Sequence, residues 1–308
     1  MKKHIVILTL AFLMIIMIAG CGGEKKLTGD YAESGVKLSY APAEGKTIFY
    51  RSDSDDLTEF SEKGYSSSTL SKSTSYQSFT VNYVREDTTS ITYGFLYEDV
   101  GVFQNGAYQK SEKESDLIGQ ELTIVVDPEG KLVNWSGLVD IEPDDSGIDR
   151  GQMIASNYSS IFFDYFPPRK LKVGDSWENE NTMNVSTKEG DLTQNTTKEY
   201  EVVDFVEYKG RPTAKCKVSI TILNTGEGEV EDGEGKQYAY FNEGKGEGKG
   251  TVYFDFESGY PVYSTFNWIV DFTITSVDQE TQESNEFTYY NEQKVSYTLV
   301  NESDVPSN

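Results

Sequence analysis

Apolar and polar residues alternate along much of the chain. Apolar side chains occupy every second position in residues 91–97, 122–126, 266–274 and 295–299. Successive side chains of a strand point to opposite faces of a sheet, so this period predicts strands with one apolar and one polar face. We expect a mainly β fold, built around a large curved antiparallel sheet of about 11 to 13 strands with a half-barrel or sandwich-like shape.

One segment changes this period to that of a helix. Within residues 148–166, apolar residues such as Met153, Ile154 and Tyr158 recur three or four positions apart. Pro167 and Pro168 follow directly and end the pattern, because proline cannot continue a helix. The sequence therefore predicts one helix between two β-rich halves.

The two halves resemble copies of one unit. Each opens on a glycine, Gly45 or Gly174, and each ends on a strand, an acidic turn with a glycine, Gly130 or Gly259, and another strand. The offset between the opening glycines equals that between the closing ones. We predict a first unit with the helix at 37–168, a second at 169–300 and a flexible tail at 301–308. Chance similarity between β-rich segments is the alternative.

The first residues are typical of a secretory signal. A basic start is followed by an apolar run at residues 5–17 and by small residues before Cys21. Cys21 directly after Ala19 and Gly20 resembles a bacterial lipobox. The resemblance implies that residues 1–20 form a lipoprotein signal peptide and that a diacylglycerol thioether on Cys21 anchors the mature chain. Residues 21–36 would be a flexible lipidated tether. An uncleaved membrane anchor is the alternative, for which residues 5–20 are short.

This anchor predicts an extracytoplasmic place in the cell envelope, with the membrane as partner through the N-terminal lipid. Gly22 after the cysteine resembles the sorting pattern of the outer membrane in a Gram-negative cell; in a Gram-positive cell the protein would lie on the outer face of the plasma membrane. The chain has 51 acidic and 27 basic residues and a net charge of −24. Such a charge repels phosphates and argues against a nucleic acid partner.

The cysteines and the histidine exclude several chemistries. His4, the one histidine, lies in the expected signal, so triads and zinc sites that use histidine are excluded from the mature chain. Cys216 lies on the apolar face of an alternating run, which predicts a buried thiol. We expect no cofactor and no metal, although a weak calcium site in the acidic, glycine-rich residues 226–236 stays an alternative.

A row of glycines is the most informative internal feature. Its members share one face of a predicted strand with an apolar continuation: Gly244, Gly246, Gly248, Gly250, Val252 and Phe254. A strand without side chains on half of one face permits close approach by a bulky group. The helix of residues 148–166 or a bound ligand would fill that space; a loose hairpin tip is the remaining interpretation.

Two segments carry a family resemblance. Residues 165–177 (YFPPRKLKVGDSW) and 246–259 (GEGKGTVYFDFESG) resemble signatures of an uncharacterised family of bacterial secreted lipoproteins. The resemblance covers roughly residues 36–300 and implies no known activity. The expected architecture is also similar, in outline, to the LolA-like and LppX-like half-barrel lipoproteins, and such a likeness of fold does not fix a function.

These observations favour a non-catalytic lipoprotein that binds a lipid or another amphiphile in the concave face of its sheet. The alternative is a structural or adhesion protein of the cell surface, whose 21 tyrosines would contact glycans or partner proteins. A carboxylate-based hydrolase that works without histidine is a minor alternative.

Overall fold

The computed structural model describes residues 24–27, 29–40, 43–104, 106–110, 115–127, 132–138, 150–162, 166–186, 190–231 and 236–307. The expected signal peptide, the lipidation site Cys21, the first closing turn at Gly130 and part of the acidic segment 226–236 lie outside these residues.

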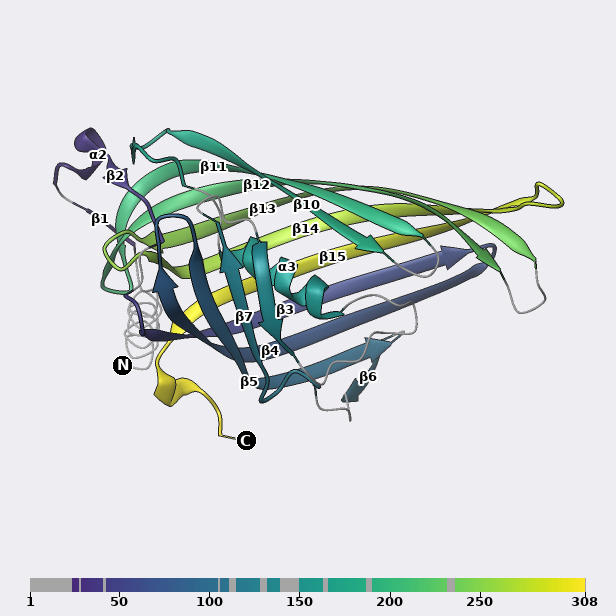
Figure 1. The fold of residues 1–308 in the computed structure, drawn as a ribbon, viewed down its shortest axis with the longest axis horizontal. Helices are drawn as coiled ribbons and strands as arrows, with labels where there is room; N and C mark the ends of the chain where they lie inside the picture. Colours follow the sequence, from purple (N-terminus) through teal and green to yellow (C-terminus); the bar gives the residue numbers. More distant parts are fainter. Residues whose placement is uncertain are drawn as a thin grey trace, which may run out of the picture.

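Long antiparallel strands dominate the fold (Figure 1). The helices are α2 (Tyr31–Ser34), α3 (Arg150–Phe162) and the 3₁₀ helix η1 (Glu302–Asp304). The strands are β1 (Lys25–Lys26), β2 (Val36–Lys37), β3 (Thr47–Glu62), β4 (Tyr65–Val84), β5 (Thr89–Gln104), β6 (Ala107–Lys110), β7 (Glu121–Val126), β8 (Leu132–Gly137), β9 (Lys170–Leu171), β10 (Ser176–Ser186), β11 (Asp191–Tyr208), β12 (Arg211–Glu231), β13 (Gln237–Asp255), β14 (Tyr260–Asp278) and β15 (Ser284–Val300).

One sheet of 13 strands contains all of these except the small β2–β9 pair. Its order is β11-β12-β13-β14-β15-β3-β4-β5-β7-β8, with β10 and β1 side by side along the outer edge of β11 and β6 on the edge of β5. Each half is a meander, and the pairing of β15 with β3 joins them. The predicted curved antiparallel sheet is confirmed, and so is the helix between the halves.

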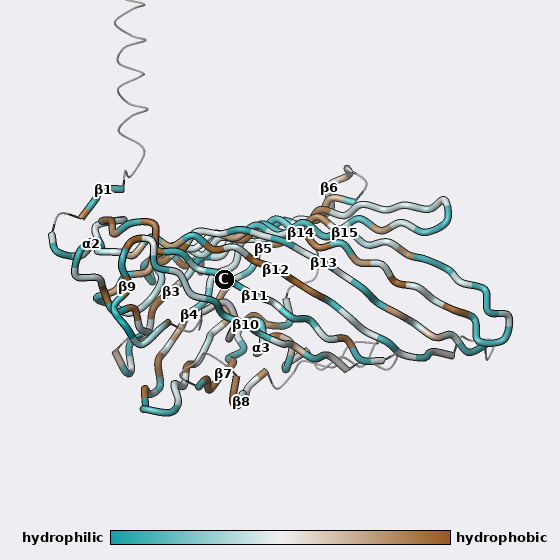
Figure 2. Tube along the Cα trace, turned by 90° about the horizontal axis from the view of Figure 1, so that it is seen from above, coloured by the Kyte–Doolittle hydropathy of each residue, from teal (hydrophilic) through white to brown (hydrophobic). Residues whose placement is uncertain are grey.

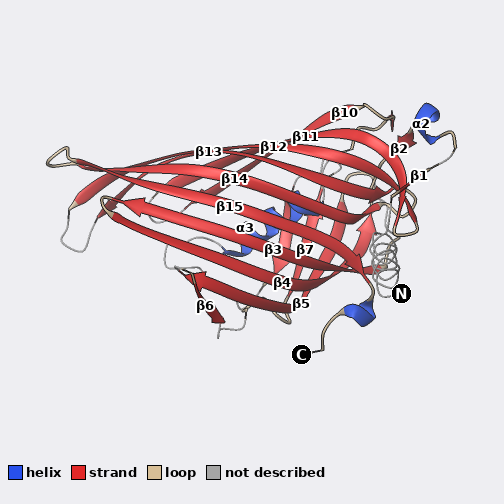
Figure 3. Ribbon diagram, turned by 180° about the vertical axis from the view of Figure 1, so that it is seen from behind, coloured by secondary structure: helices blue, strands red, loops and turns tan. Residues whose placement is uncertain are grey.

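Helix α3 lies on one face of this sheet, in front of it in Figure 1 and behind it in Figure 3. We call this the inner face and the opposite one the outer face. The helix contacts β7 and β8 at one end of the strand order and β10 at the other. The Trp135 indole of β8 donates to the Gln152 side chain at 2.6 Å, and the Gln77 amide of β4 donates to the Tyr158 hydroxyl at 2.8 Å. The helix therefore fills the gap between the edges of an unclosed sheet.

The two halves repeat each other in detail. Gly45 and Gly174 both have positive φ, and their N–H groups donate to equivalent carbonyls, Val81 at 2.7 Å and Val202 at 2.8 Å. A β-bulge follows each acceptor strand residue at the same place, between Val81 and Tyr83 and between Val202 and Asp204. A second pair of bulges occurs in the closing hairpins, β7–β8 and β13–β14. Matching bulges support the duplication; the unit boundaries stay a prediction.

The apolar core occupies one end of the sheet. Its largest fully buried side chains come from both halves: Tyr50, Tyr93, Phe205, Phe254, Leu38, Ile91, Leu122, Ile124 and Leu171. Beyond the core the long strands continue as a layer in which residues 53–62 of β3 and 65–76 of β4 are at most half-buried. Figure 2 shows these strands projecting past α3, with hydrophobic and hydrophilic residues interspersed. The protein thus has a packed end and a thin far end.

The expectation of a flexible tether at residues 21–36 is wrong for its described part. β1 pairs with β11, the Leu27 N–H donates to the Phe205 carbonyl at 3.0 Å, and β2 pairs with β9. Leu27, Tyr31 and Val36 pack against the core, and burial of their apolar surface holds this segment on the sheet. The first residues of the expected flexible tail are also held in place, since the Asn301 N–H donates to the Asp304 carboxylate at 2.9 Å.

We expect Ile124→Ala to lower the free energy of unfolding by about 2–5 kcal/mol, because Ile124 is fully buried and the truncation leaves a cavity in the core. Leu223→Ala is the matched control: Leu223 is 46% exposed on β12, and a change within about 0.5 kcal/mol is expected. Urea unfolding followed by circular dichroism measures both. Equal losses would contradict a core confined to one end.

Candidate functional site

A groove of about 390 Å³ separates α3 from the inner face of the sheet. Met153 and Asn157 of α3 line it on one side. The opposite wall is apolar and comes from β12 and β14: Ile220, Ile222, Phe266, Trp268, Val270 and Phe272. Polar side chains of β11 and β15 border this wall. Concave, mainly apolar sites with a few polar groups are the usual form of small-molecule sites, so this groove is the first candidate.

Strand pairing brings these residues together from distant parts of the chain. One row of paired residues runs across the sheet. Gly248 of β13 pairs with Ile220 of β12 on one side and with Trp268 of β14 on the other, and Trp268 pairs in turn with Gln293 of β15. Directly opposed residues of an antiparallel sheet point to the same face. All six residues singled out in the glycine strand therefore lie on the inner face, as the alternation predicts.

The atoms that approach the glycine row most closely belong to the neighbouring strands and not to the helix expected there. The atoms nearest to a Cβ added at Gly244, Gly246, Gly248 or Gly250 come from β14, at 2.4–2.7 Å, and the remaining close atoms belong to β12 and β14. The aromatic side chains of β14, such as Phe266 and Phe272, lean sideways over the glycines. The row therefore makes room for these large neighbours, which build the groove wall. The helix stands on the far side of the groove.

The apolar end of the same strand has a different role. Phe254 is buried, and its ring lies 4.8 Å from the Phe166 ring and 5.3 Å from the Tyr40 ring, measured between centroids. Phe166 belongs to the predicted helical range but lies after the end of α3. Val252 packs against the core beside it. These two residues close the packed end of the inner face.

The polar border gives the groove its electrostatic character. The Asn291 amide donates to the Asp56 carboxylate at 2.8 Å, and the Thr58 hydroxyl donates to the same oxygen at 3.3 Å. Lys198 lines the groove from β11, opposite the β15 side. Among the described lining residues, an apolar wall thus lies between a cation on one strand and neutral amides on another. That arrangement suits a ligand with an apolar body and a polar end.

Sequence patterns identified part of this site. The apolar alternation of β14 and the apolar face of Cys216 with Ile220 and Ile222 were visible before folding. Lys198, Gln293 and Met183 were missed, because each is an ordinary residue of a polar or mixed strand. Only the register of β10, β11 and β15 brings them to the groove, and no local signal encodes that register.

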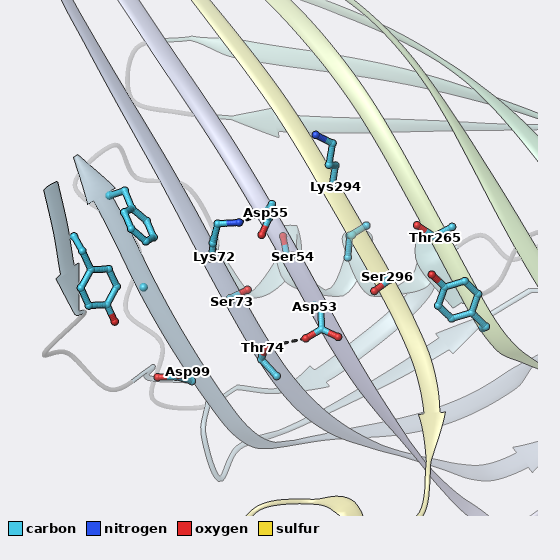
Figure 4. A pocket seen from close by; sticks show the side chains of 15 residues that line it. Asp53, Ser54, Asp55, Lys72, Ser73, Thr74, Asp99, Thr265, Lys294 and Ser296 are labelled. Carbon is cyan, nitrogen blue, oxygen red and sulfur yellow. Dashed lines mark hydrogen bonds and ion pairs between the residues drawn. The ribbon is translucent and has the colours of Figure 1, made fainter. Parts of the chain in front are cut away.

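The outer face carries a second hollow, of about 590 Å³ (Figure 4). Asp53 and Asp55 of β3 lie there, and each is already engaged: the Thr74 hydroxyl donates to Asp53 at 2.8 Å, and Lys72 lies 2.7 Å from Asp55. Arg51 adds a second partner for Asp53 at 2.6 Å. Engaged, partly exposed carboxylates of this kind are surface ion pairs, which are weak indications of chemistry.

Metal and thiol chemistry find no support in the described residues. Among them no group of three or more histidine, cysteine, aspartate or glutamate side chains could hold a metal ion. Cys216 is buried, and burial raises the pKa of its thiol to about 12. A reactive cysteine needs a lowered pKa, so this thiol is structural, as the sequence predicts.

Comparison with models of protein families gives no match, and neither does comparison with curated protein sequences. Three solved structures illustrate the structural likenesses. OccK2 (OpdF) of Pseudomonas aeruginosa is 6% identical with a TM-score of 0.25, covering 84% of this chain and 100% of that chain. An outer membrane channel of Pseudomonas putida F1 is 10% identical (TM-score 0.21; 88% and 100%). OmpF of Salmonella typhi, in complex with daunomycin, is 7% identical (TM-score 0.25; 82% and 98%).

TM-scores this low carry no argument about the fold or function of this chain. The resemblance of residues 165–177 and 246–259 to a lipoprotein family stays a prediction. Within the described part of the chain, no helix has the length and apolar character required to cross a membrane.

We expect Gly248→Ala to destabilise the fold by about 1–3 kcal/mol, because the new methyl would lie 2.6 Å from the Trp268 Cβ and 2.7 Å from the Asn267 carbonyl oxygen. Lys249→Ala, on the outer face of the same strand, is the control and should stay within about 0.5 kcal/mol. Urea unfolding monitored by tryptophan fluorescence distinguishes the two. A neutral Gly248→Ala would show that β14 does not pack over the glycines.

We expect the Cys216 thiol to react with dithiobis-nitrobenzoate at pH 8 only after unfolding, since the side chain is buried. Its folded pKa of about 12 exceeds the ordinary 9.0, so its contribution to stability is complete below pH 9 and is lost as the pH rises to about 12. Burial also raises the pKa of Tyr50 and Tyr93, which strengthens the same alkaline trend. Equilibrium unfolding from pH 8 to 11 should show falling stability. Rapid labelling of the folded chain would contradict the buried assignment.

Proposed function

We propose that this protein is a lipid-anchored, extracytoplasmic bacterial protein that binds an amphiphile in the groove between α3 and the inner face of the sheet. The observation that carries the proposal is the apolar wall of β12 and β14 facing a helix across an open groove. The wall stays accessible at Trp268 and Phe272, which are half-buried, whereas Ile220 and Ile222 below them are buried.

The chemistry of the groove favours an acyl chain with a polar end. An apolar chain gains free energy by burial against the wall, about 0.8 kcal/mol per methylene. A polar head cannot be buried there without hydrogen bonds, and Lys198 and Gln293 at the border supply a charge and an amide group. A purely polar ligand would make no apolar contact with the wall, and a purely apolar ligand would make no hydrogen bond with the polar border.

The N-terminal sequence supports the place of action. The segment that ends at Cys21 has the order of a lipoprotein signal, and two or three acyl chains on that cysteine would hold the chain stably on a membrane. A membrane-bound protein meets amphiphiles at high local concentration. We infer a non-catalytic role, because the chain after the expected signal contains no histidine and because Asp53 and Asp55 in the hollow are engaged by cations or hydroxyls.

One feature favours the second candidate, a surface protein that contacts glycans. The outer hollow combines aromatic side chains, Tyr263 and Tyr108, with the hydroxyls of Thr265 and Ser296. Sugars bind to such combinations through their apolar faces and their hydroxyl groups. The inner groove and the outer hollow lie on opposite faces of one sheet, so binding at each can be tested separately.

Native mass spectrometry of the chain from residue 24 onward, after incubation with a bacterial lipid extract, tests the first candidate. The wild-type chain should retain an adduct of lipid mass. Trp268→Ala removes the centre of the groove wall and should weaken binding at least tenfold. Ile269→Ala, the next residue of β14 on the outer face, should leave binding unchanged.

Quenching by a dibrominated fatty acid then locates the ligand. The chain has three tryptophans, and Trp268 is the one that lines the groove. Trp268→Phe keeps an aromatic wall, so the adduct should remain while most of the quenching disappears. Unchanged quenching would place the ligand elsewhere, and a bare protein mass throughout would favour the surface-contact candidate.

A further inference from the structure

The first described residues are fixed to the packed end of the sheet by several bonds. The Glu24 carboxylate accepts from the Lys215 ammonium at 2.7 and 2.8 Å and from the Tyr253 hydroxyl. In β1, Lys25 pairs with Glu207, and the Lys26 ammonium lies 3.4 Å from the Asp204 carboxylate. We call this set of contacts the N-terminal clasp.

The clasp lies beside the hairpin that joins β11 to β12. The turn of that hairpin is formed by Lys209 and Gly210, both with positive φ. Because β1 runs antiparallel to β11, the chain followed backward from Lys26 to Glu24 leads toward this turn. Cys21 stands three residues before Glu24. A fully extended chain spans at most about 3.6 Å per residue, so Cys21 lies within about 11 Å of Glu24.

We propose that the membrane holding Cys21 meets this end of the molecule directly, with the β11–β12 hairpin at the lipid headgroups and the far ends of the long strands pointing away from the bilayer. The proposal rests on the lipid anchor of the proposed function but not on the ligand of the groove. A long flexible tether would let the protein adopt any orientation on the membrane. A tether of only three residues before a fixed Glu24 restricts that orientation.

The surface around the clasp suits a bilayer interface. The half-buried Tyr208 ring stacks on the buried Tyr253 ring with centroids 4.1 Å apart, and the half-buried Tyr263 lies 6.1 Å from Tyr253. The exposed Lys209 stands 5.8 Å over the Tyr208 ring, whereas Lys215 is engaged by Glu24. Tyrosine is enriched at membrane interfaces because one end is apolar and the other polar, and lysine reaches headgroups with its long stem.

Two acidic groups of this end are paired within the clasp. Glu24 and Asp204 each lie against a lysine, whereas Glu207 of β11 is exposed, as are Asp30 and Glu33 at α2, which contacts β11. A chain with a net charge of −24 is repelled by anionic lipids, so in this proposal the lipid anchor and the short tether, and not electrostatic attraction, hold this end at the bilayer.

The orientation has a consequence for the far end. β12 runs from Arg211 at the hairpin to Glu231, which at about 3.3 Å per residue is about 65 Å. The β14–β15 hairpin at Gln282 would therefore stand well clear of the membrane.

The experiment uses the full lipidated chain, reconstituted in vesicles of phosphatidylethanolamine and phosphatidylglycerol that carry a headgroup-attached quencher. A fluorophore is placed on Lys209→Cys at the near hairpin or on Gln282→Cys at the far one. Cys216 is buried and stays unlabelled in the folded chain. We expect quenching at position 209 to exceed that at position 282 at least threefold. Equal quenching overturns the proposal.

Glu24→Lys tests the clasp, because it sets two ammonium groups against each other at Lys215. The variant should still float with vesicles, while the quenching at position 209 falls to the level at 282. Lys294→Ala, which removes an outer-face ion pair with Glu292 far from the clasp, is the control and should change neither quantity. If the chain without substitutions does not float with vesicles, the lipid anchor of the proposed function is wrong. If it floats but both positions are quenched equally, only the proposed orientation is wrong.

Discussion

The structure depends on how the apolar inner face of a wide sheet is shielded from water. The segments that pack on this face cover only part of it. A sheet of 13 strands twists and curls, and here its ends come near one another without pairing. α3 contacts β7 and β8 on one side of the gap and β10 on the other. The segment from Leu27 to Tyr40 adds further apolar side chains. The groove lies between α3 and the strands of this face, where the cover does not pack closely on the sheet.

The groove wall follows from the same constraint at the level of side chains. β14 carries aromatic residues on its inner face, and β13 presents the hydrogen atoms of glycines opposite Phe266 and Trp268. The Phe266 and Phe272 rings extend sideways over the glycines. A row of larger residues would force the rings upward into the groove.

Much of the fold was predictable from the sequence, because it depends on local periodicity. The alternation in β5, β7, β14 and β15 identified strands and their buried faces, and proline at 167 marked the region where the helix ends. The similarity of the two halves was also predictable, since Gly45 and Gly174 both adopt a positive φ at equivalent turns and glycine adopts this conformation most readily. Such signals depend on a few neighbouring residues, so they can be recognised without knowing the order of the strands in the sheet.

The groove border and the N-terminal clasp were not predictable in this way. Lys198 and Gln293 line the same cavity only through the four strand pairings from β11 to β15, and Glu24 contacts Lys215, which lies 191 residues later in the chain. The glycine row illustrates the intermediate case. Its face was predicted correctly, but its occupant was decided by the neighbouring strand, whose identity the sequence does not reveal.

Residues of the N-terminal clasp alternate with inner-face residues along two strands. On β13, the Tyr253 side chain points to the outer face and its hydroxyl donates to the Glu24 carboxylate, while the next residue, Phe254, points inward against Phe166. On β12, Lys215 points outward to the same Glu24 between the buried Ala214 and Cys216. The residues that fix the N-terminus are thus interleaved with residues that seat the segment after the helix.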